Sequence, residues 1–245
     1  MNPAIRTATL VLALLAFTAP AFAEAVTLPT RPGVTVPFSY LPAPSPTRSV
    51  ILFTGASGVV AATRNNFLLR VADRFVAAGF SVAIADVPSD HATGLPDEFR
   101  AGPDNAVDIA AIAAFLQQRA AVPVWLIGTS RGTISAAAAA ARIGPPRIAG
   151  LVLTSTVWRA GDFLMLDQIQ VPTLIVHNRD DGCAQSPFSS ASAGLAGLRA
   201  APAKDLVAVS GGTSKSGPCE ALSPHGYYGI ESQVVPAIID WIKAH

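Results

Sequence analysis

Short apolar runs alternate with amphipathic stretches along most of this chain. From residue 49 onward, the apolar runs are rich in Val, Ile and Leu and are apolar at consecutive positions. Such runs are typical of strands that are buried on both faces of a sheet. Between them, apolar residues recur every three or four positions, as they do in helices with one buried face. The pattern predicts an α/β fold, in which a mostly parallel central sheet has helices on both faces.

The individual elements follow from where each run begins and ends. Strands are expected at residues 49–54, 80–85, 123–127, 148–153, 172–176 and 206–209. Helices are expected at residues 65–78, 103–119, 135–141, 187–198 and 231–244. Residues 25–28 and 34–40 form a weaker pair, and because Pro37 interrupts the second we expect a hairpin at the sheet edge. Residues 86–102 are expected to be a polar loop.

The N-terminal stretch has a different pattern, which indicates a targeting segment. Arg6 precedes an apolar run at residues 10–17, which is too short to span a bilayer as a helix. The run Ala21-Phe22-Ala23 has the A-x-A form of a cleavage signal. We therefore predict a signal peptide at residues 1–23 and a single domain at residues 24–245, without stable membrane insertion. An uncleaved anchor is the alternative. The mature protein is expected to be exported to the periplasm or the medium.

Composition narrows the range of partners and the state of the cysteines. Hydrophobic residues make up 51% of the chain and charged residues 13%, with a formal net charge of +1. The sequence has no basic run that would favour nucleic acid, so a small-molecule partner is expected. Export would place Cys183 and Cys219 in an oxidising compartment, which predicts a disulfide between them. Two free buried thiols are the alternative.

The predicted strand at residues 123–127 leads into a turn with candidate chemistry. The turn Gly128-Thr129-Ser130-Arg131-Gly132 fits G-x-S-x-G, and a predicted helix follows it. Between a strand and a helix, this motif is typical of a nucleophile elbow, which presents its serine at the tip of a strained turn. Ser130 is thus the candidate nucleophile. An ordinary turn with a helix-capping serine is the alternative.

The elbow, the strand–helix alternation and a Ser…Asp…His order together make the mature chain resemble the α/β-hydrolases. It resembles the small, single-domain, dienelactone-hydrolase-like and esterase-like forms, although the former often have cysteine where this chain has Ser130. The resemblance implies an acid just after the strand at residues 172–176. Many relatives carry His-Gly-x-x-Asp there, and this chain has His177-Asn178-Arg179-Asp180-Asp181. By that spacing Asp181 is the implied acid and Asp180 the alternative.

The resemblance also places the base and the oxyanion donors. The base is expected between the last strand and the last helix, where His225 lies, while His177 is expected to make a structural hydrogen bond. The implied oxyanion donors are the N–H groups of Arg131 and Ala56, with Ser57 as the alternative to Ala56. We expect the Arg131 side chain to pair with an acid near the elbow; a place in the lining of the pocket is the alternative. A Cys183–Cys219 disulfide would tie the acid loop to the histidine loop.

The resemblance implies a serine hydrolase that cleaves carboxylic esters of short or medium acyl chain through an acyl-enzyme. Peptides, amides and thioesters are alternative substrates of the same triad, and a non-catalytic binding module is a further alternative. Residues 155–171 are too short for a large cap domain, so we expect an open site. Their apolar residues, such as Trp158 and Phe163, are expected either to form a wall of the site or to face the core. No metal and no cofactor are expected, because the histidines lack ligand spacing.

Overall fold

The computed structural model describes residues 23–245, so the predicted signal peptide lies outside the described residues except for Ala23. An eight-stranded sheet has the order β1-β2-β4-β3-β5-β6-β7-β8. Its strands are β1 (Glu24–Arg31), β2 (Val34–Leu41), β3 (Arg48–Phe53), β4 (Phe80–Ala85), β5 (Val124–Thr129), β6 (Gly150–Thr154), β7 (Thr173–Asn178) and β8 (Lys204–Val209). From β4 to β8 in this order all neighbouring strands are parallel, and only the pairs β1–β2 and β2–β4 are antiparallel. This mostly parallel sheet confirms the predicted fold class.

Six α-helices connect or flank the strands. They are α1 (Phe67–Ala77), α2 (Asp97–Ala101), α3 (Pro103–Arg119), α4 (Gly132–Ile143), α5 (Ala191–Gly197) and α6 (Glu231–Ala244). Short 3-10 helices are η1 (Val60–Ala62), η2 (Ser89–His91), η3 (Trp158–Leu164), η4 (Leu166–Gln168), η5 (Phe188–Ser190) and η6 (Pro224–Gly226). Within residues 23–245, none of the helices has the length and apolarity to cross a bilayer.

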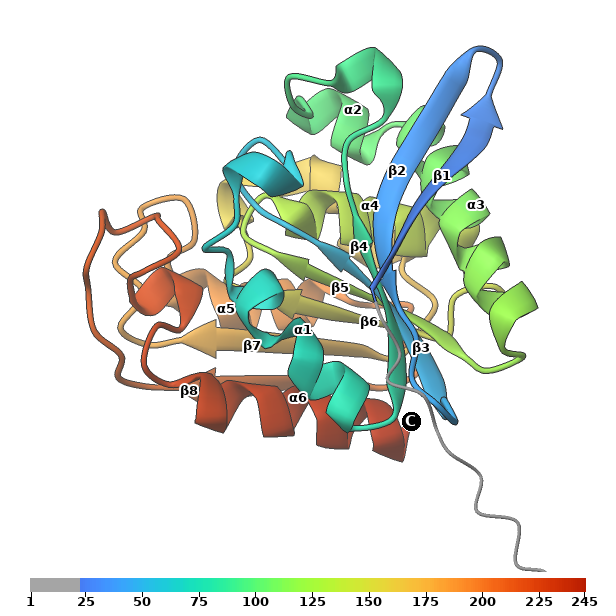
Figure 1. The fold of residues 1–245 in the computed structure, drawn as a ribbon. Coiled ribbons are helices and arrows are strands. Elements are labelled where there is room, and N and C mark those ends of the chain that lie inside the picture. Colours follow the sequence, from blue (N-terminus) through green and yellow to red (C-terminus); the bar gives the residue numbers. More distant parts are fainter. Residues whose placement is uncertain (1–22) are drawn as a thin grey trace, which may run out of the picture.

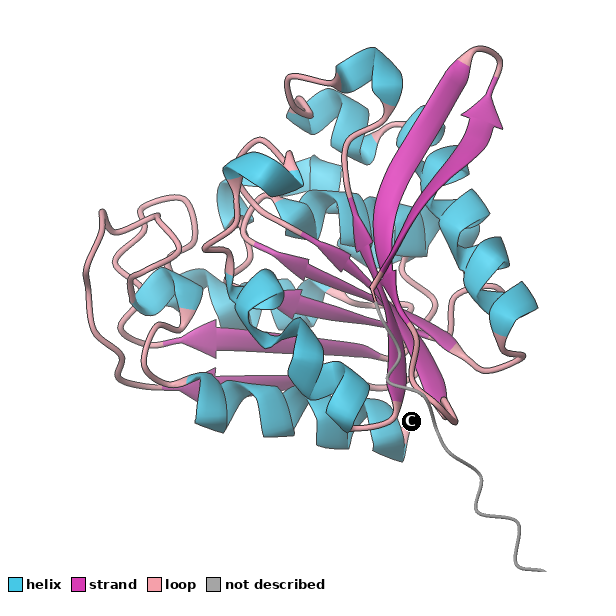
Figure 2. Cartoon of the chain, in the orientation of Figure 1, coloured by secondary structure: helices cyan, strands magenta, loops and turns pink. Residues whose placement is uncertain are grey.

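Helices cover both faces of the sheet, because successive strand residues point to opposite sides. Val50 and Leu52 pack with α1 and α6 in one core cluster, whereas Ile51 and Phe53 pack with α3 and α4 in another. Figure 1 shows α1 and α6 in front of the sheet and α3 and α4 behind it. Figure 2 shows the strands fanning out between these two layers.

Two predictions about elements need correction. The strand at residues 34–40 does form an antiparallel hairpin with its predecessor, but β2 also pairs with β4, so only β1 is at the edge. The predicted polar loop at residues 86–102 contains η2 and α2. The helix α2 is one short turn, and its sequence Asp-Glu-Phe-Arg-Ala is too brief to show helical periodicity.

A buried ion pair fastens the hairpin to the rest of the domain. Asp108 of α3 is 2% exposed, and its carboxylate accepts hydrogen bonds from Arg31 Nε and Nη2, each at 2.9 Å, and from the Thr30 hydroxyl. Arg31 also contacts Asp90 at 2.9 Å. A carboxylate this deeply buried requires its partners, since an unpaired buried charge is strongly destabilising.

Replacing Arg31 with Met should therefore leave Asp108 unpaired while keeping the apolar stem. We expect a loss of about 3 kcal/mol in the free energy of unfolding. At about 2–4 °C per kcal/mol, Tm in calorimetry should fall by roughly 6–12 °C. The double variant Arg31→Met/Asp108→Leu should recover part of the loss. As a control, Arg147→Met changes an exposed arginine that makes no ion pair within residues 23–245, and an equal loss there would contradict the prediction.

Candidate active site

The elbow between β5 and α4 has a backbone shape that its glycines permit. Ser130 lies between them with φ of 52°, a left-handed conformation that is strained for a residue with a side chain. A Cβ at Gly128 would lie 2.5 Å from the carbonyl oxygen of Gly132, and one at Gly132 would collide with the carbonyl oxygen of Phe53. The missing side chains let strand, turn and helix approach closely enough to force the serine outward.

Ser130, His225 and Asp181 form a continuous hydrogen-bonded relay. His225 Nε2 is 3.0 Å from Ser130 Oγ, and His225 Nδ1 is 2.8 Å from Asp181 Oδ2. Asp181 and His225 are buried, and Ser130 is half-buried. Asp180, the alternative acid, is exposed. It accepts a hydrogen bond from the Gly211 N–H at 2.6 Å and so stabilises the turn instead of joining the relay. The geometry thus brings together the three side chains that the sequence singled out.

The Asp181 carboxylate is held by more groups than the sequence indicated. Its Oδ1 accepts from the Cys183 N–H at 2.9 Å, and its Oδ2 accepts from the Ser186 hydroxyl at 2.9 Å. Ser186 Oγ is also 3.0 Å from His225 Nδ1. Burial alone would raise the pKa of Asp181, but hydrogen bonds with His177 and His225, the His225 charge and the Cys183 N–H hold it well below its ordinary range. The acid therefore stays ionised beside the imidazole.

His177 has a structural position, as expected. Its ring is fully buried, and its Nε2 is 2.9 Å from the carbonyl oxygen of Ser186 and 3.5 Å from Asp181 Oδ2. The ring stacks on Trp158, with centroids 5.8 Å apart. His177 thereby fixes the loop that carries both Asp181 and Ser186.

A separate network holds the loop that carries His225. The Ser155 hydroxyl donates to the His225 carbonyl oxygen at 2.6 Å, and the Ser155 N–H donates to the Tyr227 hydroxyl at 2.9 Å. Tyr227 in turn donates to the Val176 carbonyl oxygen at 2.7 Å, and burial raises the pKa of its phenol. From α1, Arg70 reaches the carbonyl oxygens of Ala221 and Gly226 at 3.1 and 2.7 Å. The histidine loop is therefore tied to β7, to the loop after β6 and to α1.

The acid loop and the histidine loop are joined directly. The structure links Cys183 and Cys219 by a disulfide, with Cα atoms 4.5 Å apart. Asn178, which stands where many relatives have glycine, donates its side-chain amide to the carbonyl oxygens of Gly211 at 2.9 Å and Pro224 at 3.0 Å. One covalent bond and two hydrogen bonds thus fix the acid relative to the base.

The loop after β3 lies against the elbow. A Cβ at Gly55 would be 2.8 Å from Ser130 Cβ, so only glycine permits this approach. A turn closed by the Gly58 N–H and the Gly55 carbonyl oxygen, 3.0 Å apart, contains Ala56 with φ of 50°. Within residues 23–245, the N–H groups of Ala56 and Arg131 donate to no acceptor. Both are therefore available as oxyanion donors.

Two arginines brace this loop and the elbow. The guanidinium of Arg100 is buried and donates to the carbonyl oxygens of Ala56 at 2.9 Å and Leu95 at 3.2 Å. Burial, assisted by the charge of Arg131, lowers its pKa to about 10. Arg131 pairs with Asp97 of α2 at 2.6 Å, which confirms the predicted ion pair near the elbow.

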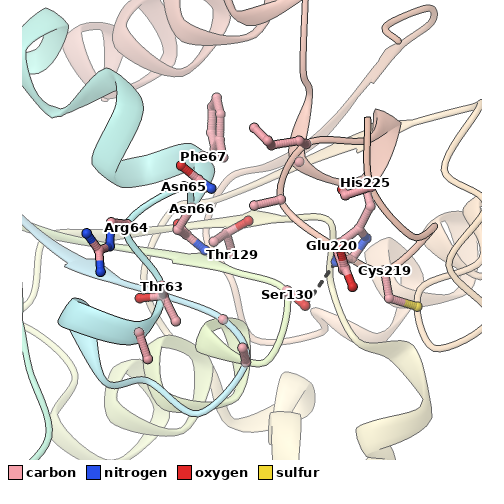
Figure 3. A pocket seen from close by; sticks show the side chains of 17 residues that line it. Thr63, Arg64, Asn65, Asn66, Phe67, Thr129, Ser130, Cys219, Glu220 and His225 are labelled. Carbon is pink, nitrogen blue, oxygen red and sulfur yellow. Dashed lines mark hydrogen bonds between the residues drawn. The ribbon is translucent and has the colours of Figure 1, made fainter. Parts of the chain in front are cut away.

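A pocket of about 410 Å³ opens beside the relay (Figure 3). It is lined by Gly55, Ala56, Ala62, Thr63, Arg64, Asn65, Asn66, Phe67, Thr129, Ser130, Ser216, Cys219, Glu220, Ala221, Leu222, His225 and Gly226. None of its lining residues comes from 155–171, so the expectation of an apolar wall from that segment is wrong. Instead, Leu164 is buried and Trp158 and Phe163 pack on the core, which is the alternative interpretation of these residues. Only η3 and η4 lie between β6 and β7.

Nothing among residues 23–245 groups three or more potential metal ligands. The site is thus made of a serine, an imidazole, a carboxylate and free backbone donors. These are the groups of nucleophilic acyl transfer.

Comparisons with known proteins place this arrangement in a fold class. No family model matches the sequence, and no curated protein matches it. Solved structures do match. A dienelactone hydrolase from Anabaena variabilis has TM-score 0.70 and 16% identity, covering 93% of this chain and 99% of that chain. An esterase from Pyrococcus furiosus has TM-score 0.68 and 14% identity, covering 91% of each. An α/β serine hydrolase homologue from Coxiella burnetii has TM-score 0.65 and 17% identity, covering 89% and 96%. This chain has the α/β-hydrolase fold.

The disulfide generates one prediction. It closes a loop with a sequence separation of 36, for which chain-entropy arguments give about 3–4 kcal/mol. The double variant Cys183→Ala/Cys219→Ala should lose this stability, because the acid loop and the histidine loop are no longer linked covalently. Reducing the wild type with dithiothreitol should give the same change, since Cys219 is exposed. An unchanged Tm after verified reduction would contradict the prediction.

The lowered pKa of Asp181 generates a second prediction. A carboxylate whose pKa is lower in the folded state adds stability at pH values above its unfolded pKa of about 3.9. That stability is lost as the pH falls through the folded-state pKa. The Tm difference between the wild type and Asp181→Asn should therefore be largest near neutral pH and should narrow as the pH drops below about 4. A difference that stays constant over a pH series in calorimetry would show that Asp181 contributes no ionisation-linked stability.

Proposed function

We propose that this chain is a serine hydrolase that cleaves carboxylic esters through an acyl-enzyme on Ser130. The observation that carries the proposal is the relay from Ser130 Oγ to His225 Nε2 and on to Asp181, located at the mouth of a pocket. A serine hydroxyl is a weak nucleophile until a base accepts its proton, and this geometry supplies the base at 3.0 Å.

The proposed reaction follows from these contacts. Ser130 Oγ attacks the ester carbonyl carbon while His225 Nε2 takes its proton. The negative oxygen of the tetrahedral intermediate accepts hydrogen bonds from the Ala56 and Arg131 N–H groups, each typically worth about 10²–10³ in rate. The intermediate then expels the alcohol, which receives the proton from His225. Water, activated by His225, hydrolyses the acyl-enzyme, and Asp181 stabilises the imidazolium throughout.

We propose residues 1–23 as a signal peptide that exports the single domain of residues 24–245 to the periplasm or the medium. The disulfide supports export, because disulfides persist in oxidising compartments. Among the structural neighbours, the protein from Pyrococcus furiosus is called an esterase, which supports an ester as substrate. The same relay would serve a thioesterase or an amidase, so the experiment must separate these.

A 4-nitrophenyl ester series from acetate to octanoate tests the proposal. We expect the purified wild type to hydrolyse the short members and Ser130→Ala to fall to the background rate. As a matched control, Ser192→Ala changes an exposed serine on α5 and should keep wild-type activity. A fluorophosphonate probe should label the wild type and leave Ser130→Ala unlabelled.

Two outcomes would redirect the proposal. Labelling of Ser130 without ester hydrolysis would favour a thioester or an amide, which the corresponding thiophenyl ester and anilide would detect. Absence of both labelling and hydrolysis in a folded protein would contradict a serine hydrolase altogether.

A further inference from the structure

We infer that Asn66 and Thr129 are specificity-determining residues, which bind an uncharged acceptor oxygen on the substrate. The substrates favoured would be esters that carry an ether, hydroxyl or carbonyl oxygen close to the scissile group, rather than plain alkyl esters. This inference rests on the proposed ester hydrolysis at Ser130.

The orientation of the Asn66 amide is fixed by the helix that it begins. Asn66 is the N-cap of α1, and its Oδ1 accepts the Leu68 N–H at 3.0 Å. Because the cap uses the oxygen, the NH₂ group must point the other way. Asn66 is only 9% exposed, lines the pocket, and its NH₂ group has no acceptor within residues 23–245.

Thr129 presents a second unpaired donor to the same pocket. It is the last residue of β5, directly before Ser130, and is 3% exposed. Across the described part of the chain, its hydroxyl makes no hydrogen bond. Asn66 and Thr129 both line this pocket, and Figure 3 shows them on the side of the view away from His225 and Glu220. The two side chains come from different elements, so they are two separate observations.

Two nearly buried side chains whose donors have no partner in residues 23–245 thus line one cavity, whereas buried polar groups are normally hydrogen-bonded. An alkyl chain in this part of the pocket would displace water from both donors without offering them a hydrogen-bond acceptor. An acceptor oxygen would satisfy them. Sites built to bond a polar group therefore discriminate strongly against analogues that lack it.

The charges on the pocket lining favour a neutral acceptor. Arg64 and Glu220 are both exposed and lie on opposite walls, so the lining carries one positive and one negative group. A carboxylate on the substrate would be attracted by one and repelled by the other. An uncharged acceptor oxygen is thus the substrate group that these donors favour.

Two pairs of esters test the inference, one for each side of the scissile bond. 4-Nitrophenyl methoxyacetate and 4-nitrophenyl butyrate differ by an ether oxygen in the acyl chain. 2-Methoxyethyl acetate and butyl acetate differ likewise in the alcohol. For each pair the quantity measured is the ratio of kcat/KM for the oxygen-containing ester to that for the alkyl ester. Comparing variants with the wild type cancels the intrinsic reactivity of each ester.

The variants remove one donor at a time. Asn66→Ser keeps the helix cap but loses the amide NH₂ group, since serine is an equally good N-cap. Thr129→Val keeps the shape and loses the hydroxyl. Ser192→Ala is the control, because Ser192 is exposed on α5 and does not line the pocket.

We expect Asn66→Ser and Thr129→Val each to lower the ratio about tenfold in at least one pair, with Ser192→Ala within about twofold of the wild type. Unchanged ratios in both pairs for Asn66→Ser would overturn the inference while leaving the proposed function intact. If the wild type hydrolyses none of the esters and Ser130 is not labelled, the proposed function itself is overturned. Should Thr129→Val fail to fold, Asn66→Ser alone decides the matter.

Discussion

The approach of three backbone segments at the elbow is the constraint on which the site depends. Gly128, Gly132 and Gly55 each stand where a Cβ would strike a neighbouring segment. Their absence of side chains brings β3, β5 and α4 together and leaves Ser130 with φ of 52°. The strain at that one residue persists because the packing around it is fully determined, with the alanines of α4 almost wholly buried. The proposed nucleophile is thus placed by core packing, together with backbone hydrogen bonds from the Ser130 N–H to the Thr154 carbonyl oxygen at 3.1 Å and from the Thr133 hydroxyl to the Ser130 carbonyl oxygen at 2.6 Å.

The acid and the base are placed by a different means. Both lie on loops beyond the strand ends, where core packing does not fix them. Hydrogen bonds do so instead, from Ser186 and Cys183 to Asp181 and from Ser155 to the His225 backbone, while the disulfide joins the two loops. Because Asp181 is buried, its charge is tolerated only with this full set of donors. The precision of the relay therefore depends on groups outside the relay itself.

Local patterns explain which parts of the site were predictable from sequence. The motif G-x-S-x-G between a strand and a helix indicates Ser130. His225 is the histidine between the last strand and the last helix, where the resemblance requires one. Ser186 and Tyr227 carry no such signal, since their roles arise only when loops distant in sequence meet. The apolar run from Trp158 was ambiguous, because an apolar surface suits a pocket wall and a core equally well. Only the packing of η3 on the core resolves it.

The same reasoning explains why polar side chains stand in the pocket lining although the core beside it is apolar. Its walls are built from helix and loop ends, which carry polar caps, whereas the sheet behind it is apolar on both faces. A capping residue such as Asn66 uses its side-chain oxygen to cap the helix, and its NH₂ group remains available to the cavity. The fold therefore positions the proposed nucleophile through its core, while the proposed substrate preference depends on side chains that also end a strand or begin a helix.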